Sequence, residues 1–366
     1  MDLNTSAQTT GTSMRESPEP AGWDTYRAAV RSELDDEVGA ARRHPGILSN
    51  NFTTLWSRLE GTVAGGKWMR PRLVHFGFRA YAGADHQACA RLGAAFEMLH
   101  AALLVHDDVI DRDFVRRGAP TVGALYRDEA AAVGFDRQDA EHAGHSASII
   151  AGDLLLAGSI KLAATAGAAV GRTGDIVDVV HGAIQASAAG ELDDLLFSLA
   201  PETVELDQIL NMERLKTAAY SFEAPLHAGA LLAGAPSDDA ARLGGIGRRI
   251  GTAYQVIDDV LGTFGDPATT GKSVESDLRG GKRTVLTAFA ASDSDFKAAW
   301  SAFRRGETAV APVRAALQAS GAEAHARSLA ARLVAAALRE AAGLGLDAAR
   351  YAELESITHH VLYREQ

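Results

Sequence analysis

The chain has 366 residues, of which 47% are hydrophobic and 23% are charged, and its formal net charge is −11. This acidic balance argues against general nucleic-acid binding, which favours a basic surface, and any bound polyanion would need metal ions or clustered Arg and Lys. Cys89 is the only cysteine, which excludes an intrachain disulfide and predicts a cytoplasmic protein.

Residues 1–22 are rich in Ser, Thr, Pro and Glu, a composition that predicts a disordered N-terminal segment. They contain no apolar core of the kind found in secretory signals, so we expect no such signal. The most apolar stretch, residues 148–160, is interrupted by Asp153 and by glycines. A membrane-spanning helix needs about 18 consecutive apolar residues, and we therefore expect no integral membrane association.

From residue 23 to residue 366 the pattern predicts a single all-α domain. Ala and Leu dominate, β-branched alternation is scarce, and Gly or Pro separates helical segments such as 87–110 and 241–264. These helices are apolar on more than one face, as buried helices are. Two stretches are polar and mixed in charge, and we expect loops there, at residues 127–146 and 264–284.

The first acidic cluster is Asp107, Asp108 and Asp111, at the end of an apolar helical run. Positions i and i+4 share one face of a helix, where like charges repel unless a cation lies over them. Oxygen ligands of this kind suit Mg2+, which binds through one or two carboxylates and substrate phosphates. A solvated acidic helix end is the alternative, but the apolar run 101–105 argues against it.

A second acidic pair, Asp258 and Asp259, also follows an apolar helical run, and Gln255 precedes it. Two acidic pairs at helix ends are much less expected by chance than one. A cleft between two carboxylate walls could hold several Mg2+ ions around one diphosphate and neutralise the leaving group.

Basic residues occur near both acidic clusters, in 65-GGKWMRP-71, 116-RRGAPT-121 and 271-GKSVESDLRGGKRT-284. Arg presents a planar fork to phosphate, and Lys presents a compact charge. Lys216 and Thr217 form a further candidate pair, although a Lys within a helix of small apolar residues more often faces solvent.

Five motifs follow one another in order: GGKxxRP, DDxxD with RRGxPT, a KT pair, QxxDD, and a GK…GGKRT tail. Over residues 45–290, and more loosely to the C-terminus, the chain resembles the trans-type isoprenyl diphosphate synthases, also called polyprenyl synthetases. The resemblance implies the all-α isoprenoid synthase bundle around a central cavity, usually as a homodimer. It implies a magnesium-dependent prenyltransferase that condenses isopentenyl diphosphate with an allylic diphosphate.

The resemblance also assigns residues. The metal ligands would be Asp107, Asp108, Asp111, Asp258 and, less directly, Asp259, with Asp194 as a further acid near the metals. The allylic diphosphate would be held by Arg116, Lys216, Thr217, Gln255, Lys272 and Lys282. The isopentenyl diphosphate pocket would contain Gly66, Lys67, Arg70, His100 and Arg117. The catalytic set would be Asp107, Asp108, Asp111, Lys216, Asp258 and Lys272.

The family mechanism implies about three Mg2+ ions per site, which stabilise the departing diphosphate while an apolar cavity shields the allylic cation from water. The released diphosphate would take the final proton. One departure from the pattern is Gly262, which stands where the second motif usually has a third Asp, and Asp266 lies too far along to replace it. We expect activity to survive this change.

Product length should depend on residues that precede Asp107 by four, five and eight positions, because helical spacing directs them towards one channel. These are Leu103, Ala102 and Leu99, with Phe96 as a deeper floor. Since Ala102 is small, we expect geranylgeranyl diphosphate as the product; farnesyl and longer polyprenyl products are the alternatives.

Two other functions are weighed against the synthesis of a prenyl diphosphate. A class I terpene cyclase would usually lack GGKxxRP, and a non-catalytic regulatory subunit would tend to lose its acidic motifs.

Overall fold

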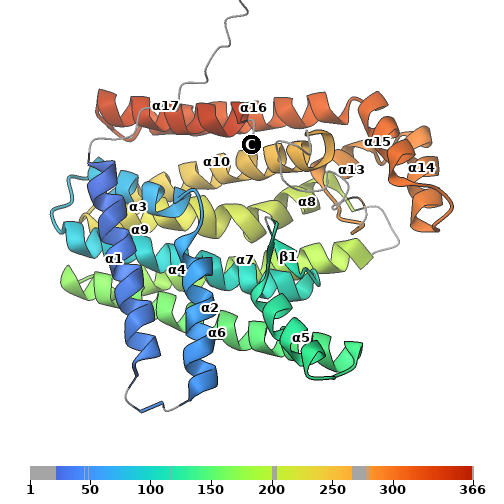
Figure 1. Ribbon diagram of the computed structural model, residues 1–366. Coiled ribbons are helices and arrows are strands. Elements are labelled where there is room, and N and C mark those ends of the chain that lie inside the picture. The colour runs from blue at the N-terminus through green and yellow to red at the C-terminus, as the bar shows by residue number, and fades with distance from the viewer. Residues whose placement is uncertain are drawn as a thin grey trace, which may run out of the picture.

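The computed structural model describes residues 22–44, 46–47, 49–116, 118–199, 204–265, 278 and 280–364. The predicted disordered segment therefore lies outside the described residues, except for Gly22. In the described part the protein is built almost entirely of helices, as the composition predicted (Figure 1).

The N-terminal half contains a helical series and one small hairpin. Its elements are α1 (Trp23–Arg42), α2 (Asn50–Ala64), α3 (Met69–Ala80), α4 (His86–Ile110), β1 (Val115–Arg116), β2 (Ala119–Pro120), α5 (Val122–Ala132), α6 (Arg137–Ala169) and α7 (Thr173–Leu199). The strands β1 and β2 pair antiparallel, with Arg116 opposite Ala119.

The C-terminal half begins with α8 (Leu206–Glu213), which continues directly into a π-helix, η1 (Arg214–Glu223). The remaining described elements are α9 (Ala224–Leu232), α10 (Ser237–Phe264), α13 (Val285–Ala290), α14 (Ser294–Arg304), α15 (Val310–Ala319), α16 (Ala322–Ala341) and α17 (Ala348–Tyr363).

The helix α4 lies at the centre of the bundle, because its sequence is apolar nearly all round. The side chains of Phe96, Met98 and Leu99 are completely buried, and a helix without a polar face is stable only inside the core. Asp85 caps the start of α4 by accepting a hydrogen bond from the Ala88 amide, which satisfies one of the unpaired donors of the first turn. The helix therefore carries its C-terminal aspartates out of a rigid, buried segment.

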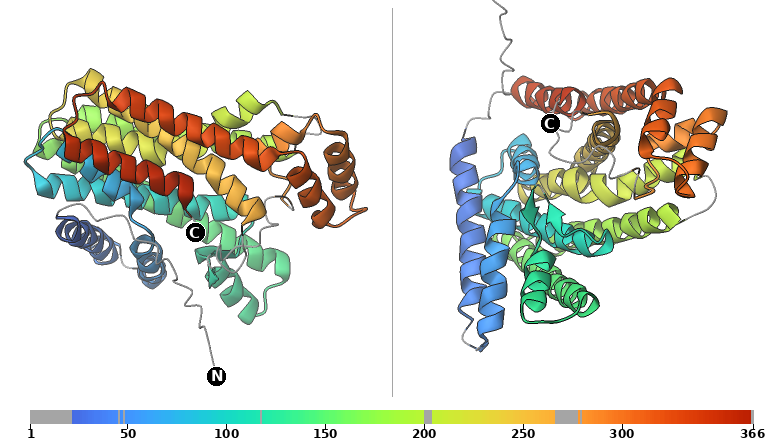
Figure 2. Two further views of the ribbon diagram at one scale, coloured as in Figure 1. Left: turned by 90° about the horizontal axis from the view of Figure 1, so that it is seen from above. Right: turned by 45° about the vertical axis from the view of Figure 1, so that its right-hand side comes forward.

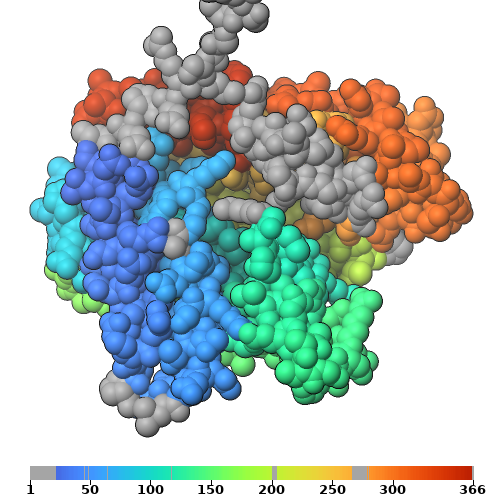
Figure 3. All heavy atoms as spheres, in the orientation of Figure 1, coloured from blue at the N-terminus to red at the C-terminus, as the bar shows by residue number. Residues whose placement is uncertain are grey.

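Helices α6, α3 and α1 pack around α4, and α16 and α17 form an outer layer over α10. Figure 2 shows α16 and α17 running side by side over α10. Figure 3 shows the molecule from the same side as Figure 1, with α1 and α2 at the left, the hairpin and α5 at the lower centre, and α14 at the right. One hydrophobic cluster extends from Trp23 to Val361.

The expectation of a loop over residues 127–146 is wrong. Helix α5 continues to Ala132, and α6 begins at Arg137 after a short turn. The Asp136 side chain accepts a hydrogen bond from the Asp139 amide and starts α6. The stretch is polar because these helix ends are mostly exposed to solvent, and Ala, Glu, Arg and Asp are compatible with an exposed helix.

Two described helices, α4 and α6, are long and apolar enough to cross a membrane by length and composition alone. The most apolar part of α4 is 78% buried inside the bundle, so its hydrophobicity is explained by the core. The corresponding part of α6 is 44% buried, and Ile149, Ile150 and Ile160 on this helix are exposed.

Candidate active site

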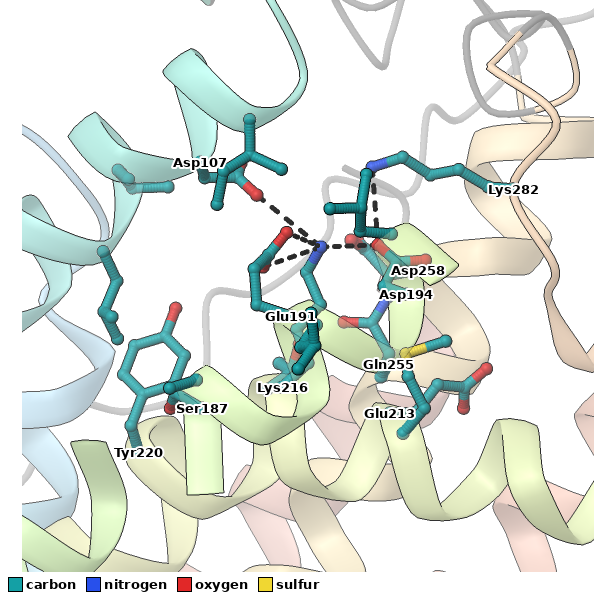
Figure 4. A pocket seen from close by; sticks show the side chains of 18 of the residues that line it. Asp107, Ser187, Glu191, Asp194, Glu213, Lys216, Tyr220, Gln255, Asp258 and Lys282 are labelled. Carbon is teal, nitrogen blue, oxygen red and sulfur yellow. Dashed lines mark hydrogen bonds and ion pairs between the residues drawn. The ribbon is translucent and has the colours of Figure 1, made fainter. Parts of the chain in front are cut away.

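A cavity of about 610 Å3 lies between α4, α7, η1 and α10, and residues 282–284 also line it. Its lining combines carboxylates and cations near the helix ends with apolar side chains such as Leu103 and Leu192. Figure 4 shows these charged side chains converging from different helices. The two acidic clusters, distant in sequence, contribute Asp107 and Asp258 to this one space.

The first acidic cluster stands at the C-terminal end of α4. Asp107 Oδ2 lies 2.7 Å from Arg116 Nη2, and Asp108 Oδ1 lies 2.5 Å from Arg116 Nε. The β1–β2 hairpin turns the chain back after α4, which brings Arg116 over these two carboxylates. Asp111 is the C-cap of α4 and accepts a hydrogen bond from Lys282 at 2.8 Å. Burial raises the pKa of Asp108 to about 6, against the opposing effect of Arg116.

Lys216 crosses from η1 to the facing walls of the cavity. Its Nζ lies 2.6 Å from Asp194 Oδ2, 3.0 Å from Glu191 Oε2 and 3.6 Å from Asp107 Oδ1 (Figure 4). Burial alone would lower the pKa of Lys216, but the three carboxylates outweigh it and raise that pKa. Burial would likewise raise the pKa of Asp107, yet the neighbouring cations, Lys216 foremost, lower it. Lys216 is therefore an ammonium that lines the cavity, and it does not face solvent as a lysine in such a helix more often does.

The position of Lys216 depends on a close approach between α7 and η1. A Cβ atom at Gly190 would lie 2.2 Å from the Lys216 amide nitrogen, a distance that no side chain tolerates. Glycine at this position lets the η1 backbone pass against α7. The π-helix itself is a rare element that occurs often at functional sites. Together these features hold the Lys216 ammonium between two acidic helices.

Glu191 is a site residue that the sequence analysis did not identify. One oxygen each from Asp107, Asp111 and Glu191 lies within 4.8 Å of the others. Three converging carboxylate oxygens with space for water match the hard oxygen ligands that Mg2+ prefers. The acidic run 190-GELDDLL-196 contained the signal, since Glu191 and Asp194 are three residues apart on one helical face. The residues present therefore fit a magnesium site.

The second acidic wall is formed by α10. Asp258 Oδ1 lies 2.6 Å from Arg364 Nη2, a residue that follows α17. Asp259 is buried and accepts a hydrogen bond from Gln255 Nε2 at 3.0 Å. Glu213 lies beside it; burial, with the Asp259 carboxylate as a second cause, raises the pKa of Glu213 well above its usual range. Both aspartates line the cavity; Asp258 is the more exposed of the two, and Asp259 also belongs to a buried carboxyl pair with Glu213.

The residues assigned to isopentenyl diphosphate lie in two places. The Tyr220 hydroxyl joins two of them, at 3.2 Å from Arg70 Nη2 and 3.3 Å from His100 Nδ1. Arg70 also lines the central cavity. Lys67 instead lines a separate notch of about 70 Å3 between α3 and α17. Gly66 has a φ of 120°, which a glycine adopts without strain.

The remaining predicted residues are placed as follows. Thr217, Gln255, Lys282 and Leu103 line the cavity. Ala102 and Leu99 are completely buried in α4 and are not among the residues that line it. Arg117, Lys272 and Asp266 lie outside the described residues. Tyr220, Glu213 and Arg364 line or border the site without having been predicted, because none of them belongs to a charged motif.

Comparison with known proteins agrees with this geometry. The polyprenyl synthetase family model matches residues 54–320. A geranylfarnesyl diphosphate synthase of Aeropyrum pernix is 38% identical over 233 residues, which cover 62% of this chain and 67% of the relative. A (2E,6E)-farnesyl diphosphate synthase of Mycobacterium tuberculosis is 33% identical over 309 residues, which cover 82% and 80% respectively.

Among solved structures, a geranylgeranyl pyrophosphate synthase from Corynebacterium glutamicum, complexed with isoprenyl diphosphate and magnesium, is similar to this chain. The TM-score is 0.83 and the sequence identity is 30%, with coverage of 93% of this chain and 99% of that protein. The resemblance inferred from five sequence motifs is therefore confirmed. The chain belongs to the polyprenyl synthetase family, and it is a trans-prenyltransferase with the all-α fold of that family.

Proposed function

We propose that this prenyltransferase condenses isopentenyl diphosphate with an allylic diphosphate and forms geranylgeranyl diphosphate as its main product. The observation that carries the proposal is the cavity in which Asp107 and Asp258 line one space together with Lys216 and Lys282. Acids and bases alternate around an apolar interior, as the binding of a metal-associated diphosphate with a hydrocarbon tail requires. The names of the relatives, which include farnesyl, geranylgeranyl and geranylfarnesyl diphosphate synthases, support the substrate class.

In this proposal Asp107, Asp111 and Glu191 hold Mg2+ at the first wall, and Asp258 holds it at the second. The bound ions, about three per site, supply positive charge that stabilises the diphosphate as it leaves. Asp108 and Asp259 would support these ligands from the protein side, because both are buried, and they are bonded to Arg116 and to Gln255 respectively.

The chain's own cations hold the two substrates. Arg116, Lys216 and Lys282 point into the cavity and would bind the allylic diphosphate, assisted by Thr217, Gln255 and Lys272. Arg70, fixed by Tyr220 and Ser221, would orient isopentenyl diphosphate together with His100. Gly66, Lys67 and Arg117 complete the proposed isopentenyl pocket.

Reaction begins when the allylic C–O bond breaks and the diphosphate leaves with the electron pair. Leu103, Leu104 and Leu192 line the cavity and exclude water from the cation that forms. The double bond of isopentenyl diphosphate attacks this cation and forms the new C–C bond. A proton then leaves the isopentenyl unit for an oxygen of the released diphosphate, which Lys216 keeps close by.

The proposed product length follows from the apolar part of the cavity. Leu103 lines it one helical turn before Asp107, and Ala102 and Leu99 lie in the same stretch of α4. No bulky aromatic side chain occupies positions 99, 102 or 103, which supports a tail longer than that of farnesyl diphosphate.

The decisive test is an assay with Mg2+, isopentenyl diphosphate and each of dimethylallyl, geranyl and farnesyl diphosphate, with products separated by chain length. We expect geranylgeranyl diphosphate to accumulate. Farnesyl or longer chains would correct the product while retaining the enzyme class. A cyclised hydrocarbon would indicate a terpene cyclase, and no product from any primer would indicate a non-catalytic regulatory subunit.

We also infer a cytoplasmic homodimer. Exposed apolar side chains outside the cavity occur on two neighbouring helices, at Ile149, Ile150 and Ile160 of α6 and at Leu196 and Leu199 of α7. Exposed apolar surface of this kind supports an interface between two copies of the chain. Light scattering after gel filtration should give twice the monomer mass, and the double variant Ile150→Glu with Leu196→Glu should give the monomer mass. A monomeric wild-type protein would contradict the inference.

A further inference from the structure

Arg364, the last described residue, is held in the second acidic wall by three contacts. Its Nη2 lies 2.6 Å from Asp258 Oδ1 and donates to the Tyr254 carbonyl oxygen at 3.2 Å. Its guanidinium carbon lies 3.7 Å from the centroid of the Tyr254 ring. The Arg364 side chain is only 6% exposed, whereas that of Asp258 is 37% exposed. Arg364 therefore contacts Asp258 from the protein side and leaves part of the carboxylate open to the cavity.

This contact completes a pattern of charge compensation around the cavity. At the first wall, Arg116 pairs with Asp107 and Lys282 pairs with Asp111. At the second wall, Arg364 pairs with Asp258. Each of these carboxylates is thus neutralised by a cation of the chain itself. A metal ion that binds one of them has to displace or share that cation.

Arg364 differs from the other two cations in where it comes from. Arg116 and Lys282 belong to charged motifs next to the acidic clusters, whereas Arg364 follows α17, more than a hundred residues after Asp258. The fold alone brings it to α10, because α17 packs on that helix. A planar guanidinium that stacks on an aromatic ring and bonds a carboxylate at once is a specific arrangement that lysine cannot reproduce.

We propose that Arg364 is a positioning residue that acts as the internal counter-ion of Asp258 and competes with the divalent cation for that carboxylate. In the absence of metal it holds the Asp258 side chain in place and prevents repulsion within the acidic wall. When the cation binds, the guanidinium leaves Asp258 while its stacking on Tyr254 keeps it at the rim of the site. The end of α17 is thereby coupled to metal loading. This inference rests on the proposed role of Asp258 as a metal ligand.

The experiment measures Mn2+ binding to the full-length protein without substrate, from the loss of the free-ion electron paramagnetic resonance signal. Arg364→Gln removes the competing charge, so we expect Mn2+ to bind about five- to tenfold more tightly than to the wild type. Arg364→Lys keeps a charge but loses the fork and the stacking, and should give an intermediate affinity. Arg339→Gln makes the same change of net charge at an exposed position of α16 and should leave the affinity unchanged.

A double-mutant cycle with Asp258→Asn localises the effect. In that background Arg364→Gln should no longer tighten Mn2+ binding, because the carboxylate for which the two cations compete is absent. Equal Mn2+ affinities of the wild type and Arg364→Gln would overturn the proposal, as would a gain that persists in the Asp258→Asn background. If the wild type forms prenyl products in the assay above while these affinities are equal, the proposed function stands and only the role of Arg364 fails.

Discussion

The Lys216 ammonium lies 2.6 Å from the Asp194 carboxylate and 3.6 Å from Asp107, so one side chain of η1 joins the acidic faces of α7 and α4. This relationship explains how several carboxylates share a partly buried space before any metal binds. The cations that are proposed to hold the diphosphate meanwhile neutralise the acids that are proposed to hold the metal. When metal and diphosphate bind, the carboxylates then exchange the cations of the chain for metal ions, and those cations exchange the carboxylates for the diphosphate.

Replacing Lys216 should remove a cation that neutralises the neighbouring carboxylates and that is proposed to hold the diphosphate. Lys216→Gln is expected to lower kcat/KM by about 100-fold or more, because a preorganised charge aimed at a leaving group is lost. Steady-state kinetics at saturating Mg2+ measures this effect. Lys161→Gln is the matched control, since Lys161 pairs with Glu37 on the surface and is 63% exposed. A decrease of less than threefold for Lys216→Gln would contradict the assignment.

The contact between Gly190 and η1 can be tested with a pair of glycines on α7. Gly190→Ala places a methyl group against the Lys216 backbone and should destabilise the protein by about 1–3 kcal/mol, as overpacking does. Activity should fall as well, because Lys216 must shift. A Cβ atom at Gly182 meets nothing within 4 Å, so Gly182→Ala should be neutral or slightly stabilising. Urea denaturation compares the two variants, and equal stabilities would show that the close approach does not matter.

Product length should respond to the side chain at the apolar wall of the cavity. Leu103→Phe adds bulk one helical turn before Asp107 and should shift the products towards farnesyl diphosphate. Ala102→Phe, one residue earlier and completely buried, should act in the same direction. Leu329→Phe on α16 makes the same exchange away from the cavity and should leave the products unchanged. An unaltered product distribution in both α4 variants would refute the proposed channel.

Acid should destabilise the protein through His75. This residue is 5% exposed and stacks on Tyr26, with ring centroids 4.2 Å apart. Burial, with Arg79 as the next cause, lowers the pKa of His75 to about 3. In the unfolded chain it titrates near its ordinary value of about 6.5, so between these two values only the unfolded state binds the proton, and stability falls as the pH drops.

At pH 5.5 the difference between the folded and unfolded pKa of His75 should lower the free energy of unfolding by about 1.4 kcal/mol. Chemical denaturation at pH 7.5 and pH 5.5 should show that His75→Phe loses less stability on acidification than the wild type. His142→Phe makes the same change at an exposed position of α6 and should keep the wild-type pH dependence. Identical pH dependence in the wild type and His75→Phe would exclude this contribution.

Metal and diphosphate should stabilise the protein cooperatively. Mg2+ alone must displace an internal cation, and diphosphate alone must draw that cation away from an acid. When both are added, the released cations can bind the diphosphate and the released carboxylates can bind Mg2+. A ligand at a concentration about 100 times its dissociation constant raises the free energy of unfolding by about 2.7 kcal/mol. Calorimetry should show a melting temperature raised by about 3–4 °C with both ligands and by clearly less than half of that with either one. If the shift of the melting temperature with both ligands equalled the sum of the two single shifts, the proposed exchange of ion-pair partners would be contradicted.

The sequence by itself determined the fold class, the family and most of the charged site. Helical periodicity without strand alternation predicts a bundle, and five ordered motifs place Asp107, Asp258 and their basic neighbours in one function. Such motifs are readable because the chemistry of a metal-bound diphosphate requires particular residue types at short, regular spacing.

Only the tertiary structure decided which residues meet across long sequence separations. It turned Lys216 into the cavity, added Glu191 to the first wall and carried Arg364 to Asp258. The KT pair named Lys216 and the run 190–196 is acidic, but the contacts themselves depend on how two helices pack: α7 against η1 through Gly190, and α17 against α10. The local pattern also misjudged residues 127–146, where polarity reflects solvent exposure of helix ends rather than a loop. Packing between distant segments is a property of the whole chain, and it decides where each charge finds its partner.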